Sequence, residues 1–441
     1  MDEQLNNLLS EIRSIRLSVK CGTLTAYNGL VLESLGPDSK IGELCELLDD
    51  SGKVVCLLEV TGFRDNKLLL MPFDKLSGIS NCSPVRATGK RLSIPVGVQL
   101  LGRVVDAFCR PIDGKGQILL RDRYPLHRKP VNPMERAEIN TIVETGVGAI
   151  DALLTLGKGQ RVGVFSGSGV GKSTLLGMIS RNAHADVIVL ALIGERGREV
   201  SDFITNVLGV DGLRKSVVVA ATSDQPALAR TYAAQSAHAI AEYFSDMGKS
   251  VLLVIDSITR FAMAQREIGL AIGEPPTFRG YTPSVFSSLP PLLERCGNFK
   301  SGGSITAVYS VLVEGDDMNE PVADHMRSLL DGHIVLSRDL AARAHYPSID
   351  ILQSTSRLFD KLAKADELIL AKKIRKSLAV YESSRDMIEL GAHKPGINLE
   401  LDSAIQVKPL LDDILSQSTS TKVERNQFIG KLNSVFSEVR S

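Results

Sequence analysis

Six compact apolar runs, rich in β-branched residues, recur between Arg161 and Leu336 with helical patterns between them. They read RVGVF, DVIVLALI, SVVVAA, SVLLVID, SITAVYSVL and HIVL. Strands that are apolar throughout must be covered on both faces, and helical crossovers between them favour parallel pairing. The pattern therefore predicts a doubly wound α/β domain, whose ligand binds at the carboxyl ends of the strands.

The first run leads directly into SGSGVGKST and then into a helical pattern, which is the context that a phosphate-binding loop requires. The glycines let successive N–H groups point at phosphate oxygens, Lys172 adds charge at the β and γ phosphates, and Ser173 offers its hydroxyl to Mg²⁺. Ser166 stands where the usual pattern begins with glycine, and this change removes no phosphate-contacting group. The predicted phosphate-binding residues are Gly167, Ser168, Gly169, Val170, Gly171, Lys172, Ser173 and Thr174.

Two carboxylates follow later strands. Asp256 ends the run SVLLVID, where a carboxylate can orient magnesium and its waters, although many buried strands end in Asp as a helix N-cap. Glu195, in ALIGERGREV, follows the strand that begins near Asp186, and a carboxylate there can polarise the attacking water. Without the neighbouring motifs, Glu195 and Arg196 would be read as a surface ion pair.

Composition narrows the class of protein. With 51 Lys+Arg and 51 Asp+Glu the net charge is +0, so the chain as a whole is not marked as a nucleic-acid binder. The six cysteines have no C-x-x-C spacing, which fits a reducing cytoplasm and argues against structural zinc. No apolar run approaches the ~18 residues of a membrane span, and we expect no signal peptide.

The pattern of apolar and polar residues along the chain predicts four parts. Residues 1–20 form an amphipathic helix, which either packs on its own domain or binds a partner. Residues 21–95 carry short apolar runs between turn signals, typical of a small β-barrel or sandwich, and we expect a barrel. Residues 96–362 contain the phosphate loop, and residues 363–441 have a charged, Leu- and Ile-rich pattern that predicts a helical C-terminal domain.

Longer segments resemble a known family. GERGREV, LLVIDSITRFAMAQRE, GEPPTFRGYTPSVFSSLPPLLERCG, GSITAVYSVLVEGDDMNEPVADHMRSLLDGHIVLSR and YPSIDILQSTSR look like successive signatures of the hexameric ATPases related to the catalytic subunit of rotary ATP synthase. The match covers most of the chain. The segment PSVFSSLPPLLERCG and the small residue at the start of the phosphate loop resemble the ATPases of flagellar and virulence type III protein export.

The resemblance implies roles for matching residues. Glu195 matches the catalytic glutamate, Arg196 a phosphate-side arginine and Asp256 the magnesium-side aspartate. Tyr346 matches the aromatic that packs on adenine, a position that would otherwise be read as a core tyrosine. Arg357 matches the arginine that reaches into the neighbouring subunit's site, where a guanidinium can stabilise charge on the γ-phosphate. The catalytic residues expected are thus Glu195, Lys172, Arg196 and Arg357.

The resemblance also implies the working form. We expect a homohexamer that hydrolyses ATP with Mg²⁺, releases export substrates from chaperones and delivers them to a membrane export gate. A central coiled-coil stalk and a stator-like regulator at the N-terminal helix are the implied protein partners. We expect a cytoplasmic protein, peripheral at the inner face of the membrane when it is bound to the export apparatus, and no nucleic-acid partner.

Three other functions are compatible with the phosphate loop and the parallel sheet. In a rotary proton or sodium ATPase the C-terminal domain carries an acidic lever, but this chain reads MIELGAHKPGINLELD there, with Lys394. An RNA translocase of the termination-factor type would need basic and aromatic interleaving in residues 21–95, and little is present. Glu195 argues against a non-catalytic nucleotide-binding subunit. The sequence leaves open whether a flagellum or an injection apparatus is served, which cargo is exported and how hydrolysis couples to the proton gradient.

Overall fold

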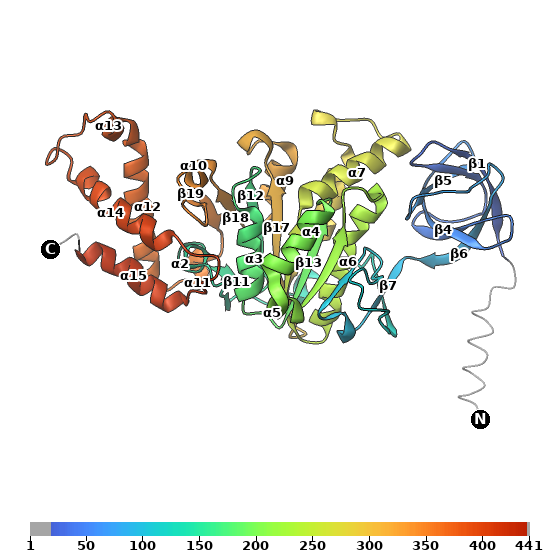
Figure 1. Cartoon of the computed structure of the whole chain (residues 1–441), viewed down its shortest axis with the longest axis horizontal. Coiled ribbons are helices and arrows are strands. Elements are labelled where there is room, and N and C mark those ends of the chain that lie inside the picture. The colour runs from blue at the N-terminus through green and yellow to red at the C-terminus, as the bar shows by residue number, and fades with distance from the viewer. Residues whose placement is uncertain (1–18, 439–441) are drawn as a thin grey trace, which may run out of the picture. The chain divides into compact units, whose positions relative to one another are not determined.

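The computed structural model describes residues 19–438, so the amphipathic helix expected over residues 1–20 falls, but for its last two residues, outside the described part. The chain divides into two compact units. The first contains the N-terminal part to Ser93 together with Gln225–Ala229 and Glu267–Pro275, and the second contains the rest. Figure 1 labels the elements along the chain.

The N-terminal unit is built on a closed barrel with strand order β1-β2-β5-β4-β3-β6, and every neighbouring pair is antiparallel. Alternate residues of its strands point inward, and Leu32, Leu58 and Leu70 are fully buried in the core. The prediction of a barrel is confirmed. The strands are β1 (Cys21–Tyr27), β2 (Leu32–Leu35), β3 (Glu43–Leu48), β4 (Val54–Arg64), β5 (Lys67–Pro72) and β6 (Pro84–Arg91).

The second unit is built on one sheet with the order β19-β18-β12-β17-β15-β13-β14-β8, in which β16 pairs beside β17. All pairs are parallel except those made by β19 and β16, so the predicted parallel sheet is confirmed. The six apolar runs are six of its strands. The strands are β8 (Arg103–Val105), β12 (Arg161–Ser166), β13 (Val187–Ile193), β14 (Ser216–Ala221), β15 (Ser250–Asp256), β16 (Gly297–Asn298), β17 (Ser304–Leu312), β18 (Gly332–Leu336) and β19 (Ile349–Ser356).

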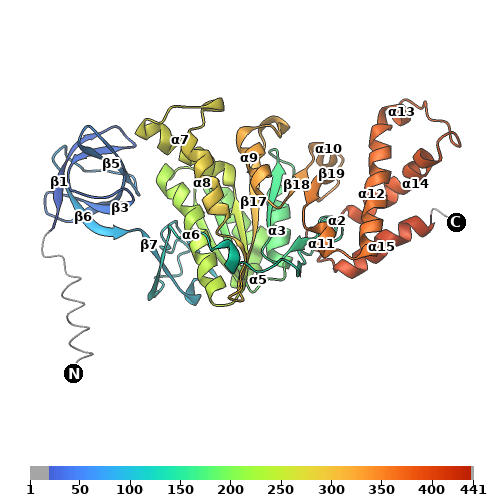
Figure 2. The ribbon, with the colours of Figure 1, turned by 180° about the vertical axis from the view of Figure 1, so that it is seen from behind.

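Helices cover both faces of this sheet, as wholly apolar strands require. Figure 1 shows α3, α4 and α5 on one face, and Figure 2 shows α6 and α8 on the other. The helices up to β19 are α2 (Gly148–Leu153), α3 (Lys172–Asn182), α4 (Gly197–Asp202), α5 (Gly209–Arg214), α6 (Ala227–Asp246), α7 (Ile258–Ile272), α8 (Pro283–Leu293), α9 (Pro321–Leu329) and α10 (Arg338–Ala342). A π-helical turn, η3 (Phe203–Leu208), joins α4 to α5, and 3₁₀ turns lie at η1 (Val98–Leu100), η2 (Pro133–Glu135), η4 (Phe278–Gly280) and η5 (Glu314–Asp316).

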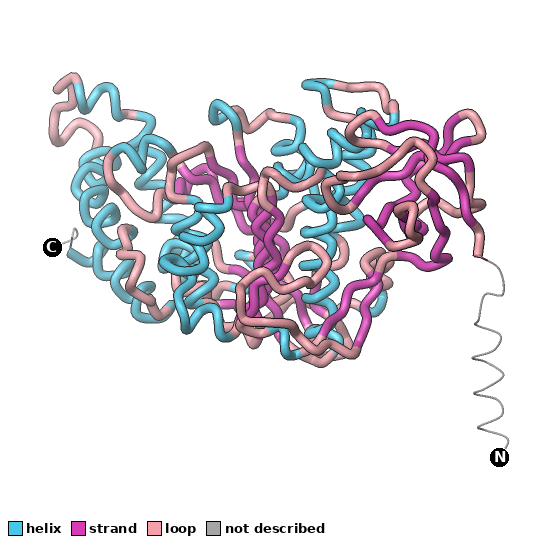
Figure 3. Tube along the Cα trace, turned by 45° about the vertical axis from the view of Figure 1, so that its right-hand side comes forward, coloured by secondary structure: helices cyan, strands magenta, loops and turns pink. Residues whose placement is uncertain are grey.

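The chain after β19 is helical, as expected, and Figure 3 separates these helices from the strands of the sheet. They are α11 (Phe359–Leu362), α12 (Ala365–Ser383), α13 (Arg385–Glu389), α14 (Leu399–Leu415) and α15 (Arg425–Glu438). Their apolar faces join the same buried cluster as the sheet, through residues such as Ile374, Leu411 and Leu432. No helix in residues 19–438 combines the length and the apolar composition needed to cross a membrane.

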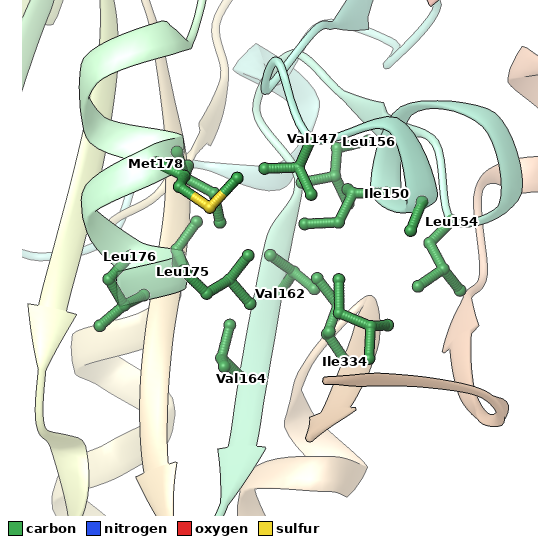
Figure 4. Packing of buried hydrophobic residues seen from close by; sticks show 14 of the residues in the cluster. Val147, Ile150, Leu154, Leu156, Val162, Val164, Leu175, Leu176, Met178 and Ile334 are labelled. Carbon is green, nitrogen blue, oxygen red and sulfur yellow. The ribbon is translucent and has the colours of Figure 1, made fainter. Parts of the chain in front are cut away.

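The helix that follows the phosphate loop is held by this core. Figure 4 shows Leu175, Leu176 and Met178 of α3 close to Val162 and Val164 of β12. Each of these side chains is at most 1% exposed, and burying an aliphatic side chain of this size contributes about 1.5–3 kcal/mol. The amino end of α3, and the loop before it, are therefore fixed on the sheet.

Two short pairs of strands lie beside these sheets: β7 (Ser93–Val96) with β9 (Asp122–Pro125), and β10 (Ile142–Val143) with β11 (Leu156–Gly157). Residues 102–116 contain Gly102, Pro111, Gly114 and Gly116, a composition typical of a connecting segment, yet Arg103–Val105 forms β8 and pairs in parallel with β14. Three residues are too few to show a periodicity, which is why the pattern did not reveal this edge strand.

Candidate nucleotide site

The phosphate loop connects β12 to α3 at the carboxyl edge of the sheet. Gly169 and Gly171 have φ values of 80° and 92°, a region that glycine occupies without strain. A Cβ at Gly167 would lie 2.4 Å from Oδ1 of Asp316, so a larger residue there would displace the exposed Asp316 side chain. Gly171 caps α3 without a side-chain hydrogen bond, so the first N–H groups of the helix are available to an anion.

Ser166 ends β12 and does not have the positive φ that would demand glycine. Its carbonyl accepts a hydrogen bond of 2.9 Å from the N–H of Val313. The side chain is 2% exposed, and its Oγ has no hydrogen-bond partner among the described residues. A serine at this position therefore leaves the course of the loop unchanged.

Three charged side chains meet beside the loop. Lys172 Nζ lies 2.5 Å from Asp256 Oδ1 and 3.7 Å from Glu195 Oε1. Their side chains are 12%, 5% and 17% exposed, respectively, so the group is shielded from solvent. The structure thus brings together the lysine, the glutamate and the aspartate that the sequence analysis selected.

The strand order explains this meeting. The loop follows β12, Asp256 ends β15 and Glu195 follows β13, while β17 lies between β12 and β15. From β17, Ser310 donates a 2.5 Å hydrogen bond to Oδ1 of Asp256, the same oxygen that Lys172 contacts. Asp256 Oδ2 makes no hydrogen bond to any residue that the structure describes. Ser310 has no motif around it, and sequence reasoning missed it.

Burial raises the pKa of Glu195, and the negative charge of Asp256 raises it further, against the opposing effect of Lys172. A cavity of about 380 Å³ opens beside this carboxyl and is also lined by Ser173, Glu199 and Asp256. A carboxylate with a raised pKa facing an open space can accept a proton from water.

The residues present fit a magnesium ion. Mg²⁺ is usually held by one or two carboxylates together with substrate phosphates and waters, rather than by a complete set of protein ligands. Ser173 and Asp256, which line the same cavity, supply a hydroxyl and a carboxylate with one uncommitted oxygen. Within residues 19–438 no cluster of three or more His, Cys, Asp or Glu could hold a metal ion on its own.

Arg260 of α7 is a second cation next to this group. Its charge lowers the pKa of Glu195, and its side chain packs on Gly194, where a Cβ would come within 2.9 Å. Its Nε is buried and has no hydrogen-bond partner among the described residues. The sequence analysis missed Arg260, although its place four residues after Asp256, in DSITR, at the start of α7, is a signal that could have found it.

The remaining predicted residues lie apart from the charged group. Tyr346 is 42% exposed, and its ring carbons lie 3.4 and 3.5 Å from where a Cβ on Gly171 would stand. Arg196 is 77% exposed and faces Glu199 at 3.8 Å. Arg357 follows β19 and is exposed, with a 3.4 Å hydrogen bond to the carbonyl of Arg327 and no carboxylate partner among residues 19–438.

A phosphate loop at the edge of a parallel sheet, with a lysine, a strand-end aspartate and a buried glutamate, defines a phosphate-loop ATPase. Residues 146–356 match the model of the ATP synthase alpha/beta family nucleotide-binding domain. Residues 363–434 match the model of the T3SS EscN ATPase C-terminal domain. These two matches cover every strand of the sheet except β8, and most of the helices that follow it.

Known proteins resemble the whole chain. The flagellum-specific ATP synthase of Bacillus subtilis is 51% identical over 94% of both chains, and the type 3 secretion system ATPase of Sinorhizobium fredii is 44% identical over 98% of this chain and 95% of its own. The solved structure of the assembled ATPase EscN from enteropathogenic E. coli has a TM-score of 0.89 at 43% identity, covering 94% of this chain and 99% of that one. The chain belongs to the family of flagellar and type III secretion ATPases, the enzymes whose ATP hydrolysis powers type III protein export.

Proposed function

We propose that the chain works as a homohexameric ring in which each ATP is hydrolysed between two subunits. The proposal rests on a difference in environment between the predicted catalytic side chains. Lys172, Glu195 and Asp256 are gathered and buried within one chain, whereas Arg357 is exposed with no carboxylate partner in residues 19–438. An exposed guanidinium is suited to meet a phosphate that another subunit holds.

The proposed reaction is an in-line attack of water on the γ-phosphate. The loop N–H groups and Lys172 hold the phosphates, and Glu195 orients the water and accepts its proton. Arg260 and the neighbour's Arg357 stabilise the charge that spreads over the γ-phosphate oxygens. Mg²⁺, held by Ser173 and oriented through Asp256, would neutralise charge on the β- and γ-phosphates.

The same proposal assigns Tyr346 to bind the adenine base of ATP, because its half-exposed ring lies over the phosphate loop. Arg196 is assigned to the phosphate side by resemblance. In this structure its guanidinium is exposed and faces Glu199, so the assignment requires a change of rotamer when nucleotide binds.

The proposed partners follow from the family. A structure of EscN with its central stalk EscO has a TM-score of 0.86 to this chain, which supports a stalk partner for the ring. We place a stator-like regulator at residues 1–20 and assign the work of hydrolysis to unloading chaperone-bound substrates and delivering them to a membrane export gate. The ring would stand in the cytoplasm, peripheral at the inner face of the membrane, without a nucleic-acid partner.

The identities favour a flagellar apparatus. Two relatives at 51% identity, from Bacillus subtilis and Treponema pallidum, are flagellum-specific. Other flagellum-specific ATPases, such as those of Borreliella burgdorferi at 46% and Salmonella typhimurium at 45%, overlap with the secretion ATPases of Sinorhizobium fredii and Xanthomonas euvesicatoria at 44% and 46%, so the proposal rests on the first two. We therefore propose that exported flagellar subunits are the cargo.

The test is Glu195→Gln, which keeps the size of the side chain and removes its basicity. We expect kcat to fall about 10²–10⁴-fold while Mg·ATP still binds, because only proton transfer is lost. In the native cell the same change should abolish export. Glu424→Gln, at an exposed carboxylate, is the matched control and should behave as wild type. Near-normal hydrolysis by Glu195→Gln would remove this residue from the reaction.

A further inference from the structure

The segment Ser416–Thr421, which reads SQSTST and follows α14, runs beside the tyrosine assigned to the base. The main-chain N–H of Gln417 donates a 2.8 Å hydrogen bond to the carbonyl of Tyr346. The hydroxyl of Ser416 lies 3.2 Å from Nδ1 of His345, the residue that precedes Tyr346. The C-terminal part of the chain therefore holds the main chain at His345 and Tyr346 in place.

The side chain of Gln417 fixes the position of that segment. The residue is 8% exposed, and its amide makes three hydrogen bonds. Oε1 accepts from the N–H of Gly148 at 3.0 Å, and Nε2 donates to the carbonyls of Gly146 at 2.8 Å and Thr421 at 2.7 Å. Both amide hydrogens and the amide oxygen thus have partners, so the side chain has one defined orientation.

Tyr346 itself has little else to hold its ring. The phenol hydroxyl makes a long hydrogen bond of 3.3 Å to the carbonyl of Ala341, and the side chain is partly in solvent. On its other side, Ser348 donates a 2.6 Å hydrogen bond to the carbonyl of Val170 in the phosphate loop. The backbone on either side of the ring is thus tied to the phosphate loop and to Gln417, in addition to local hydrogen bonds from His345 N–H to the carbonyl of Leu340 and from Ser337 N–H to the carbonyl of Ser348.

We propose that Gln417 is a positioning residue for the adenine base. Its buried amide fixes the Ser416–Thr421 segment, and that segment in turn fixes the position of Tyr346 over the phosphate loop, where the adenine would bind. The inference deepens the proposed function, because it rests on the assignment of Tyr346 to the base. Gln417 acts through Tyr346 and is not itself assigned a contact with ATP.

The Ser416–Thr421 segment is also tied to the end of α3 that lies away from the phosphate loop. Arg181, in the last turn of α3, donates a 2.7 Å hydrogen bond to the carbonyl of Thr419, and α3 begins at the phosphate loop. The segment also continues directly from α14, whose Leu411 and Leu415 lie in the core shared with the sheet. A change in the C-terminal helices is thereby transmitted to the base side of the site, while the phosphate side keeps its own contacts with the sheet.

Because Gln417 acts on the adenine side of the site only, its loss should weaken binding of some ligands and not of others. ATP, which has a base, should bind less tightly when Gln417 is lost, whereas inorganic tripolyphosphate, which has none, should bind as before. The experiment measures the Kd of both ligands with Mg²⁺ on the full chain, for wild type, Gln417→Ala, Tyr346→Ala and the double variant. Gln427→Ala, at an exposed glutamine on α15, is the control of matched residue type.

We expect Gln417→Ala to raise the Kd for ATP about five-fold, because losing its three hydrogen bonds loosens the segment that holds Tyr346, and to leave the Kd for tripolyphosphate within about two-fold. In the Tyr346→Ala background the same change should have no further effect on ATP, because the two residues act through one ring. Gln417→Glu retains the volume and the acceptor for Gly148 but loses the donors to Gly146 and Thr421, and should give the same pattern if Gln417→Ala folds poorly.

Each other outcome overturns the inference. Equal weakening of ATP and tripolyphosphate would show a general structural role for Gln417. An unchanged Kd for ATP in Gln417→Ala, while Tyr346→Ala weakens ATP, would separate Gln417 from the base and leave the proposed function standing. If Tyr346→Ala leaves ATP binding unchanged, the base assignment and the inference fail together, and the assignment of Glu195 is judged by its own substitution.

Discussion

Two groups of side chains in the nucleotide site differ sharply in environment. Lys172, Glu195 and Asp256 have exposed side-chain fractions of 12%, 17% and 5%, and they contact one another directly. Arg196 is 77% exposed, and Arg357 lies in solvent after β19. The first group is assembled by the folding of one chain, because its members end or follow strands of one sheet. The second group is not, and the proposed function assigns its completion to bound nucleotide and a neighbouring subunit.

The largest expected effect comes from the exposed group. Arg357→Ala should lower kcat about 10³-fold, because an arginine supplied across an interface stabilises charge that develops only in the transition state. The Kd for Mg·ATP should stay near the wild-type value, since Arg357 contacts none of the residues of the buried group. Steady-state hydrolysis and equilibrium ATP binding, measured on the same preparation, separate these two effects.

Arg214→Ala is the control for that substitution, since Arg214 is 77% exposed and forms an ion pair with the exposed Asp211. It should leave kcat unchanged. A wild-type kcat for Arg357→Ala would contradict the contrast between the two groups, because a dispensable Arg357 would mean that one chain holds a complete site.

The buried group predicts a smaller, pH-dependent effect. Burial raises the pKa of Glu195 above its ordinary value of 4.5, and the carboxyl must be ionised to accept a proton. As the pH falls through this raised pKa, kcat/KM should decrease about ten-fold per pH unit, and the decrease should begin above pH 4.5. Far-UV circular dichroism over the same range checks that the protein stays folded. A kcat/KM that is flat down to pH 4.5 would show that Glu195 is not the base.

The sequence predicted most of the fold, because wholly apolar runs between helical patterns have few alternatives to a covered parallel sheet. It also predicted the buried group, since phosphate-loop spacing and strand ends are local patterns. It did not reveal β8 or Ser310, whose roles arise from strand order and long-range packing, and it overlooked Arg260, which stands four residues after Asp256. No local pattern distinguishes Tyr346 or Arg357 from an ordinary core or surface residue, and resemblance to a family was needed to select them.

The most direct test of a site shared between subunits is a mixing experiment with two inactive variants. Lys172→Ala lacks the phosphate-loop cation and Arg357→Ala lacks the arginine supplied to its neighbour. In a mixed ring, an intact site forms wherever the loop of an Arg357→Ala subunit meets the arginine of a Lys172→Ala subunit, which random mixing gives at about a quarter of the interfaces. We predict that the equimolar mixture regains ATPase activity that neither variant has alone. If mixed rings form, as shown by co-purification of differently tagged chains, and the mixture stays as inactive as its components, the site is not shared and the account is wrong.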